Sequence, residues 1–152
     1  VEFERFNLTE LIGGVLQSMD ILSQQKDVKL FSGKKIQFTS WGDEFKIEQV
    51  VRNYVSNAYN HVNEEKIIEV KILREDGLAK VTVFNTGKPI PEEDVPRIWD
   101  KFFKVDKAHT REYGGNGIGL SIVKAIMESM HQQYGVKNYD NGVEFWFTLD
   151  VR

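Results

Sequence analysis

Two hairpin patterns constrain the fold of this chain of 152 residues more than any other feature of its sequence. Runs of alternating apolar residues flank two turn sequences, Asp76-Gly77 and Asp140-Asn141-Gly142. Such turns between alternating runs are typical of β-hairpins. The strands that they predict are 68–72, 79–83, 134–139 and 143–149. The sequence therefore predicts a largely antiparallel sheet.

Three other segments carry apolar residues at the spacing of one helical face. The first helix is expected from Leu8 to about Gln25, with Asn7 and Glu10 as a capping box. The second follows Gly42 and ends near Tyr59, and the third covers 118–130. With a fifth short strand at 35–40, we expect an α+β two-layer sandwich: a mixed, mostly antiparallel five-stranded sheet with three helices on one face.

Composition excludes several classes of function. A net charge of −3 and the lack of an evident basic face argue against a nucleic-acid partner. The absence of cysteine excludes a disulfide framework, a thiolate metal site and a cysteine nucleophile. No apolar run approaches the length of a membrane span, and no linker interrupts the chain, so we expect one domain over residues 1–152. Because the chain begins with Val1 rather than Met, we expect it to be a piece of a longer protein.

Four polar residues lie along the second helix: Asn53, Asn57, Asn60 and His61. On a helical projection the three asparagines border the apolar stripe, which places them at the rim of a buried cavity. A carboxamide there can offer an oxygen to Mg²⁺ and still donate through its NH₂ group. Solvated residues at a helix edge are the alternative.

The segment 85–91 follows a predicted strand and begins with Asn85. A carboxamide can accept from an adenine amino group and donate to the adjacent ring nitrogen. Gly87 would let the base approach closely, and Ile90 would form an apolar wall. An ordinary turn after a strand is the alternative.

A glycine-rich segment opens the third helix at 114–120. Its free backbone N–H groups and the helix N-terminus favour a phosphate ligand, with Lys104 and Arg111 upstream as candidate cations. The spacing is neither that of a dinucleotide fingerprint nor that of a P-loop. A glycine-rich loop without a ligand remains the alternative.

The order of these segments resembles the catalytic ATP-binding domain of sensor histidine kinases, which has a Bergerat-type fold. Residues 48–58 resemble the N box, 85–91 the G1 box, 98–103 the F box and 115–124 the G2 box. The resemblance extends from the entry Phe6-Asn7-Leu8 to the closing strand at 145–149 and so covers nearly the whole chain.

The resemblance implies roles for individual residues. Asn57 would be the Mg²⁺ ligand, Asn53 would lie near the phosphates, and these two would be the catalytic residues. The ATP contacts that it implies are Asn53, Asn57, Asn60, His61, Asn85, Gly87, Ile90, Lys104, Arg111, Gly115, Asn116, Gly117, Gly119 and Leu120. Residues 106–116 would form a mobile ATP lid, with Phe102 and Phe103 packed at its base.

The chain departs from the family pattern at three of its positions. Asn60 stands where a phosphate-contacting Lys is more common, Asn85 replaces the commoner Asp, and Pro89 replaces a glycine. The first departure removes a positive charge and leaves the triphosphate to Lys104 and Arg111. The third should stiffen the turn after Asn85.

The same comparison bears on the chemistry. Hydrolytic relatives carry a general-base Glu four residues before the metal-binding Asn, and here Asn53 holds that place. We therefore expect this domain to bind ATP·Mg²⁺ and present the γ-phosphate to a histidine on an upstream dimerisation domain. In the family, that acceptor is a histidine followed by an acidic residue on a dimerising helix. None of the three histidines, His61, His109 and His131, has this context. A response regulator would receive the phosphate next.

The resemblance also implies a setting for the domain. It would be a cytoplasmic, monomeric part of a homodimeric sensor kinase anchored in the cell membrane. Three alternatives stay open: a regulatory nucleotide-binding module without catalysis, a serine kinase of the anti-sigma-factor type, and a structural domain without a ligand.

Overall fold

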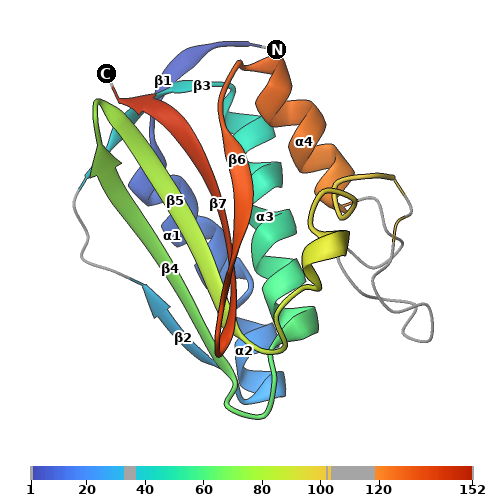
Figure 1. The fold of residues 1–152 in the computed structure, drawn as a ribbon. Helices are drawn as coiled ribbons and strands as arrows, with labels where there is room; N and C mark the ends of the chain where they lie inside the picture. The colour runs from blue at the N-terminus through green and yellow to red at the C-terminus, as the bar shows by residue number, and fades with distance from the viewer. Residues whose placement is uncertain (1, 33–36, 102, 104–118, 152) are drawn as a thin grey trace.

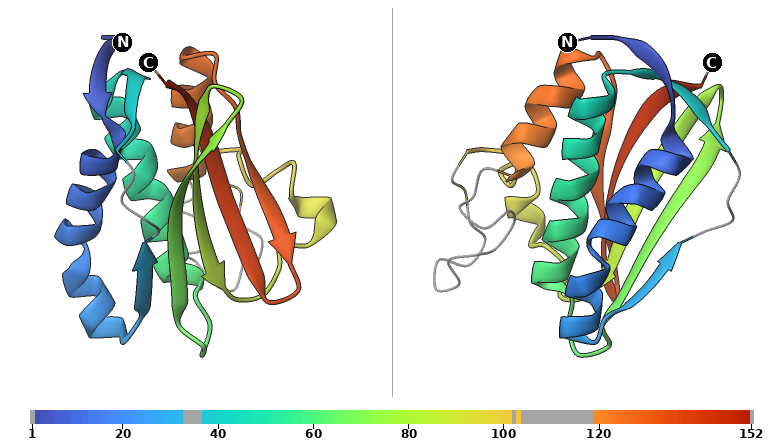
Figure 2. Two further views of the ribbon diagram at one scale, coloured as in Figure 1. Left: turned by 90° about the vertical axis from the view of Figure 1, so that its left-hand side faces the viewer. Right: turned by 180° about the vertical axis from the view of Figure 1, so that it is seen from behind.

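A seven-stranded sheet covered by helices on one face forms the molecule (Figure 1, Figure 2). This computed structural model describes residues 2–32, 37–101, 103 and 119–151. The strands are β1 (Glu4–Asn7), β2 (Lys29–Ser32), β3 (Thr39–Gly42), β4 (Ile67–Glu75), β5 (Leu78–Thr86), β6 (Tyr134–Tyr139) and β7 (Gly142–Val151). The helices are α1 (Leu8–Ser18), α2 (Asp20–Lys26), α3 (Glu44–His61), the 3-10 turn η1 (Glu92–Asp94) and α4 (Gly119–Ser129).

The sheet is mixed and mostly antiparallel, as the sequence predicts. Its strand order is β1-β3-β7-β5-β4-β2, with β6 paired to β7 beside β3. The pair β2–β4 is parallel, and each of the other recorded pairs is antiparallel. The predicted α+β two-layer sandwich is therefore confirmed.

Two strands were missed, so the predicted count of five strands is wrong. Both β1 and β2 have only four residues, too few for an alternating pattern to stand out from the neighbouring loops. Of the strand predicted at 35–40, residues 35 and 36 lie outside the described residues, and the described part is found as β3 at Thr39–Gly42. Burial of Ser40 and Gly42 rather than of a branched apolar pair explains the displaced boundary.

The first predicted helix is divided in two. Its start is as predicted, because the Asn7 side chain accepts a hydrogen bond from Glu10 N at 2.9 Å. At Met19, however, the backbone leaves helical geometry (φ −98°, ψ 4°), which separates α1 from α2. The apolar period continues across Met19, so the sequence pattern could not reveal the break. The predicted helix 8–25 is therefore corrected to two helices.

Helix α3 lies across the middle of the sheet, between α1 and α4 (Figure 2). Its inner face carries Val50, Val51 and Val55, which are fully buried in one core with Val81 and Phe147 of the sheet. Asp43 caps its N-terminus by accepting from Lys46 N at 3.2 Å. This packing fixes the polar residues at the edge of α3 relative to the ends of the strands.

No helix among the described residues has both the length and the apolar character needed to cross a membrane.

The turn into β7 brings two strands unusually close at Gly142. A Cβ atom at this position would overlap the Asn85 carbonyl oxygen and would lie 2.7 Å from the Phe84 ring. Because the first of these neighbours is backbone, relief would require the paired strands β5 and β7 to separate.

We predict that Gly142→Ala lowers the free energy of unfolding by about 2 to 3 kcal/mol, because the added methyl group overpacks this strand pair. Chemical denaturation measures the change. Gly13→Ala is the matched control: it lies on the exposed face of α1 with no atom near its Cβ, and it should stabilise by about 0.5 to 1 kcal/mol. A Gly142→Ala protein as stable as the wild type would contradict the packing described.

Candidate functional site

Asn57 on α3 is a buried amide without a partner in the described part of the chain. Only 1% of the residue is exposed, and neither its Oδ1 nor its Nδ2 atom has a hydrogen-bond partner among the described residues. An unsatisfied buried polar group costs about 1 to 3 kcal/mol, so proteins rarely keep one without a use. The amide oxygen is a hard ligand of the kind that Mg²⁺ prefers. The residue present at this position therefore fits a magnesium ligand.

The described residues offer few further ligands for such an ion. Within the described ranges, no group of three or more histidine or acidic residues could hold a metal ion. Mg²⁺ commonly binds through one or two protein oxygens together with water and substrate phosphates. The single amide oxygen of Asn57 is compatible with such a site, in which water and phosphate oxygens supply the remaining ligands.

Asn53 lies one turn before Asn57 and joins α3 to α4. Its Nδ2 atom donates to the carbonyl oxygen of Gly119 at 3.2 Å. Gly119 is the first residue of α4 and is buried, and the Leu120 side chain beside it lies in the hydrophobic core. Asn53 therefore sets the distance between the Asn57 amide and the beginning of α4.

The last turn of α3 carries Asn60 and His61. Asn60 is exposed, whereas His61 is half-buried. Burial lowers the pKa of His61 to about 4, from an ordinary value of 6.5. The imidazole is thus neutral at pH 7 and adds no positive charge to the site.

The end of β5 is tied to the end of α3 through Thr86. The carbonyl oxygen of Thr86 accepts from Asn63 N at 2.9 Å, and its hydroxyl oxygen accepts from Ile67 N at 3.1 Å. Asn85 precedes it and is 1% exposed, with its Nδ2 donating to the Thr86 carbonyl oxygen at 3.1 Å. These bonds hold the end of β5 against the segment that joins α3 to β4.

Gly87 is required by this junction. A Cβ atom at this position would lie 2.8 Å from the carbonyl oxygen of His61, and the Gly87 N–H donates to the Asn141 carbonyl oxygen at 3.0 Å. The close approach that the sequence suggests is therefore made to the backbone of α3. Approach of a base to Gly87 stays a prediction.

Ile90 is held by a residue that the sequence analysis missed. Ile90 is 2% exposed, its N–H donates to Asn138 Oδ1 at 3.0 Å, and its carbonyl oxygen accepts from Asn138 Nδ2 at 2.8 Å. Asn138 follows Tyr134 and Val136 at period two on β6, which places it on the helix-facing side of the sheet. This inward-facing position in the alternating pattern was the sequence signal that could have identified Asn138.

Part of the predicted site lies outside the described residues: Lys104, Arg111, Gly115, Asn116, Gly117, Phe102 and the predicted lid 106–116. Phe103 is half-buried and packs against the core. The nucleotide contacts of the residues outside the described ranges stay predictions. The described residues bring together Asn53, Asn57 and Gly119 on one side and Asn85, Gly87 and Ile90 on the other.

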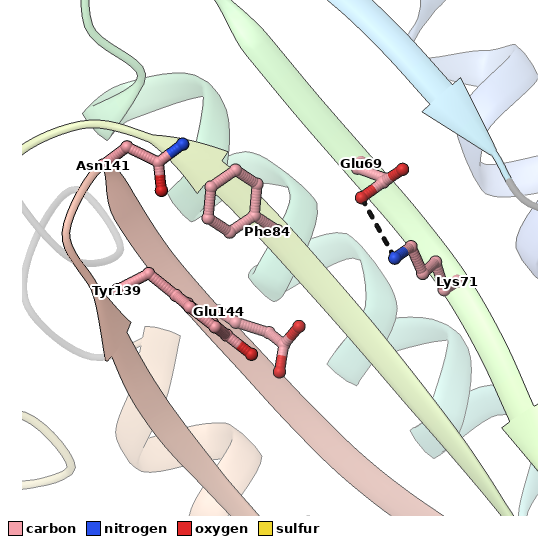
Figure 3. A pocket seen from close by; sticks show the side chains of 6 residues that line it. All are labelled: Glu69, Lys71, Phe84, Tyr139, Asn141 and Glu144. Carbon is pink, nitrogen blue, oxygen red and sulfur yellow. Dashed lines mark ion pairs between the residues drawn. The ribbon is translucent and has the colours of Figure 1, made fainter.

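A pocket of about 250 Å³ lies on the other face of the sheet (Figure 3). It is lined by Glu69, Lys71, Phe84, Tyr139, Asn141 and Glu144. Consecutive residues of a strand point to opposite faces, so Phe84 in this pocket and Asn85 beside α3 belong to different surfaces. The pocket is not part of the Asn57 site.

Comparisons with known proteins agree with this architecture. The family model for histidine kinase-, DNA gyrase B- and HSP90-like ATPases matches residues 42–152. The sensor histidine kinase CusS of Escherichia coli K12 is 34% identical over 149 residues, which cover 97% of this chain and 31% of CusS. The probable sensor kinase SilS of Salmonella typhimurium is 36% identical over 104 residues, or 68% of this chain and 21% of SilS. The chain thus spans a third or less of these relatives.

Solved structures give the same result. The nucleotide-free catalytic domain of the histidine kinase ThkA superposes with a TM-score of 0.85 and 29% identity, covering 99% of this chain and 96% of that domain. ThkA in complex with the response regulator TrrA superposes with a TM-score of 0.80, covering 99% of this chain and 42% of the ThkA chain. By sequence and by fold, the chain belongs to the histidine kinase-, DNA gyrase B- and HSP90-like ATPase family and is built like the catalytic domain of a sensor histidine kinase.

Proposed function

We propose that this chain binds ATP with Mg²⁺ and presents the γ-phosphate to a histidine on another domain of a sensor kinase. The observation that carries the proposal is the buried, unpartnered amide of Asn57. It lies one turn after Asn53, whose amide contacts the beginning of α4, where the resemblance to the family's motifs would have the triphosphate. A ligand that satisfies this amide would remove the desolvation cost that the free protein bears.

The oxygen of Asn57 would hold Mg²⁺, and the metal would neutralise charge on the phosphate oxygens when bound. Asn85 would accept from the adenine amino group, with Ile90 as an apolar wall. Asn85 is buried at the end of β5 that Thr86 ties to the end of α3, and Ile90 is buried in the segment that follows β5. The base and the phosphates would thus be placed by one rigid junction.

The side chains around Asn57 favour transfer to an acceptor over hydrolysis. The residue four positions earlier is Asn53, and its amide donates to the Gly119 carbonyl oxygen. An amide cannot take a proton from water, so it cannot act as a general base there. Positioning and charge neutralisation are then the chain's contribution to the reaction.

We further propose that the acceptor histidine lies in an upstream dimerisation domain and that a response regulator is the next partner. The complex of ThkA with TrrA is a precedent in a protein of the same fold. The full protein would be a membrane-anchored homodimer, with this domain in the cytoplasm and monomeric when isolated.

A labelling experiment tests the phosphotransfer proposal. We expect the natural full-length protein to acquire an acid-labile phosphate from ATP labelled at the γ-phosphate, and the isolated chain to stay unlabelled. Label on His61, His109 or His131 of the isolated chain would contradict an acceptor on another domain. Tight ATP binding without any label would favour a regulatory module, and acid-stable label on a copurifying partner would favour a serine kinase.

Replacement of Asn57 should affect stability and binding in opposite directions. Asn57→Leu removes an unsatisfied buried amide, so we expect the ligand-free chain to gain about 1 kcal/mol in free energy of unfolding while losing Mg²⁺-dependent ATP binding. Thermal unfolding with and without ATP and Mg²⁺ measures both effects. Asn60→Leu is the control for the stability arm: its amide is exposed, so the ligand-free stability should change by less than about 0.5 kcal/mol.

A destabilised Asn57→Leu protein would show that the amide is satisfied in the free chain. Unchanged ATP stabilisation in that variant would remove Asn57 from the nucleotide site.

The lowered pKa of His61 predicts a pH effect on stability. The folded imidazole stays neutral down to about pH 4, whereas the unfolded one gains a proton below 6.5. Acid therefore favours the unfolded state, and stability should rise with pH between about 4 and 6.5 by on the order of 3 kcal/mol.

Comparison with His61→Phe isolates this effect, because carboxylates common to both proteins cancel in the difference. Denaturation at several pH values should give a flatter profile for the variant between pH 4 and 6.5. Parallel profiles would show that His61 titrates normally in the folded chain.

A further inference from the structure

Asn138 on β6 binds both backbone groups of one residue in the segment that follows β5. Its Oδ1 atom accepts from Ile90 N at 3.0 Å, and its Nδ2 atom donates to the Ile90 carbonyl oxygen at 2.8 Å. The two residues are 48 positions apart in the sequence. We propose that Asn138 is a positioning residue for the base side of the nucleotide site, which it serves by fixing the wall formed by Ile90. The inference rests on the proposed function.

The strand register links Asn138 directly to Asn85. One row crosses the helix-facing side of the sheet and contains Ile68, Asn85, Val143 and Asn138. Neighbouring strands lie about 4.8 Å apart, so Asn85 and Asn138 stand roughly 10 Å from each other with Val143 between them. A base that meets Asn85 and Ile90 would therefore be positioned by two asparagines of a single row.

The segment between Gly87 and Trp99 is attached to β6 at two separate points. Asn138 holds Ile90 at one of them, with a longer contact of 3.3 Å from Nδ2 to Glu92 Oε1. At the other, Trp99 packs edge-on against Tyr134 with ring centroids 4.9 Å apart. Loss of the Asn138 amide would release the backbone of Ile90 from β6 and leave the Trp99 attachment in place. The change in structure should therefore stay local to the segment around Ile90.

An uncharged side-chain amide is suited to this position. It carries one acceptor and one donor group, which match the N–H and the carbonyl oxygen of Ile90. An aspartate can accept from Ile90 N but cannot donate, and a leucine of similar size can do neither. At aspartate the second carboxylate oxygen would also face the Ile90 carbonyl oxygen and the Glu92 carboxylate, which repel it, so both substitutions abolish the paired contact.

The test measures binding of ATP and of inorganic triphosphate, both with Mg²⁺, to the wild type, Asn138→Leu and Asn138→Asp. Calorimetry is done at a temperature where circular dichroism shows each protein folded. We expect Asn138→Leu to weaken ATP binding about tenfold, which corresponds to about 1.4 kcal/mol, and Asn138→Asp to weaken it at least as much. Triphosphate binding should be unchanged, because it involves no base contact.

Asn141→Ala is the matched control: its side chain lies on the opposite face, and the substitution keeps the backbone carbonyl that binds Gly87. It should bind ATP like the wild type.

Three outcomes would overturn the inference. The first is an unchanged ATP affinity in folded Asn138→Leu, and the second is an equal loss of ATP and triphosphate binding, which would indicate a general structural role. The third is unfolding of both Asn138 variants, which would show that the residue serves overall stability. A wild-type chain that binds no ATP would instead refute the proposed function itself, which distinguishes the two failures.

Discussion

The buried amide of Asn57 is the constraint around which this structure is organised. It sits on the helix that supplies the central part of the core, with Val50 and Val51 fully buried on the same helix. Among such neighbours a polar group without a partner is a local loss of stability, offset by the apolar contacts of α3 with the sheet. The free domain is therefore less stable than it would be with an apolar side chain at position 57. A ligand that bonds to the Asn57 amide would remove this loss.

The rest of the site is placed by its relation to that helix. Thr86 fastens the end of β5 to the end of α3, and Asn53 fastens the middle of α3 to the beginning of α4. These attachments connect segments that are 23 and 66 positions apart, since Asn63 bonds to Thr86 and Asn53 to Gly119. On β6, the side chain of Asn138 likewise binds the backbone of a distant residue, Ile90.

Much of this could be predicted from the sequence, because periodicity and turn chemistry are local. The two hairpins, the Asn7 cap and the position of Asn57 near the apolar stripe all follow from spacing. The break at Met19 could not be predicted, because the apolar period of the sequence runs through it. The missing partners of Asn57 and the Ile90–Asn138 contact depend on which distant strands come together, and no local pattern records that.

The central claim is that the Asn57 side chain completes its coordination through a metal bound with the nucleotide. Side-chain amide NMR of the isolated chain with ATP tests it most directly, with paramagnetic Mn²⁺ in place of Mg²⁺. We predict that the Asn57 NH₂ signal broadens when both ATP and Mn²⁺ are present and is unaffected by Mn²⁺ without ATP. A sharp, unshifted Asn57 signal in the presence of bound ATP and Mn²⁺ would contradict this account.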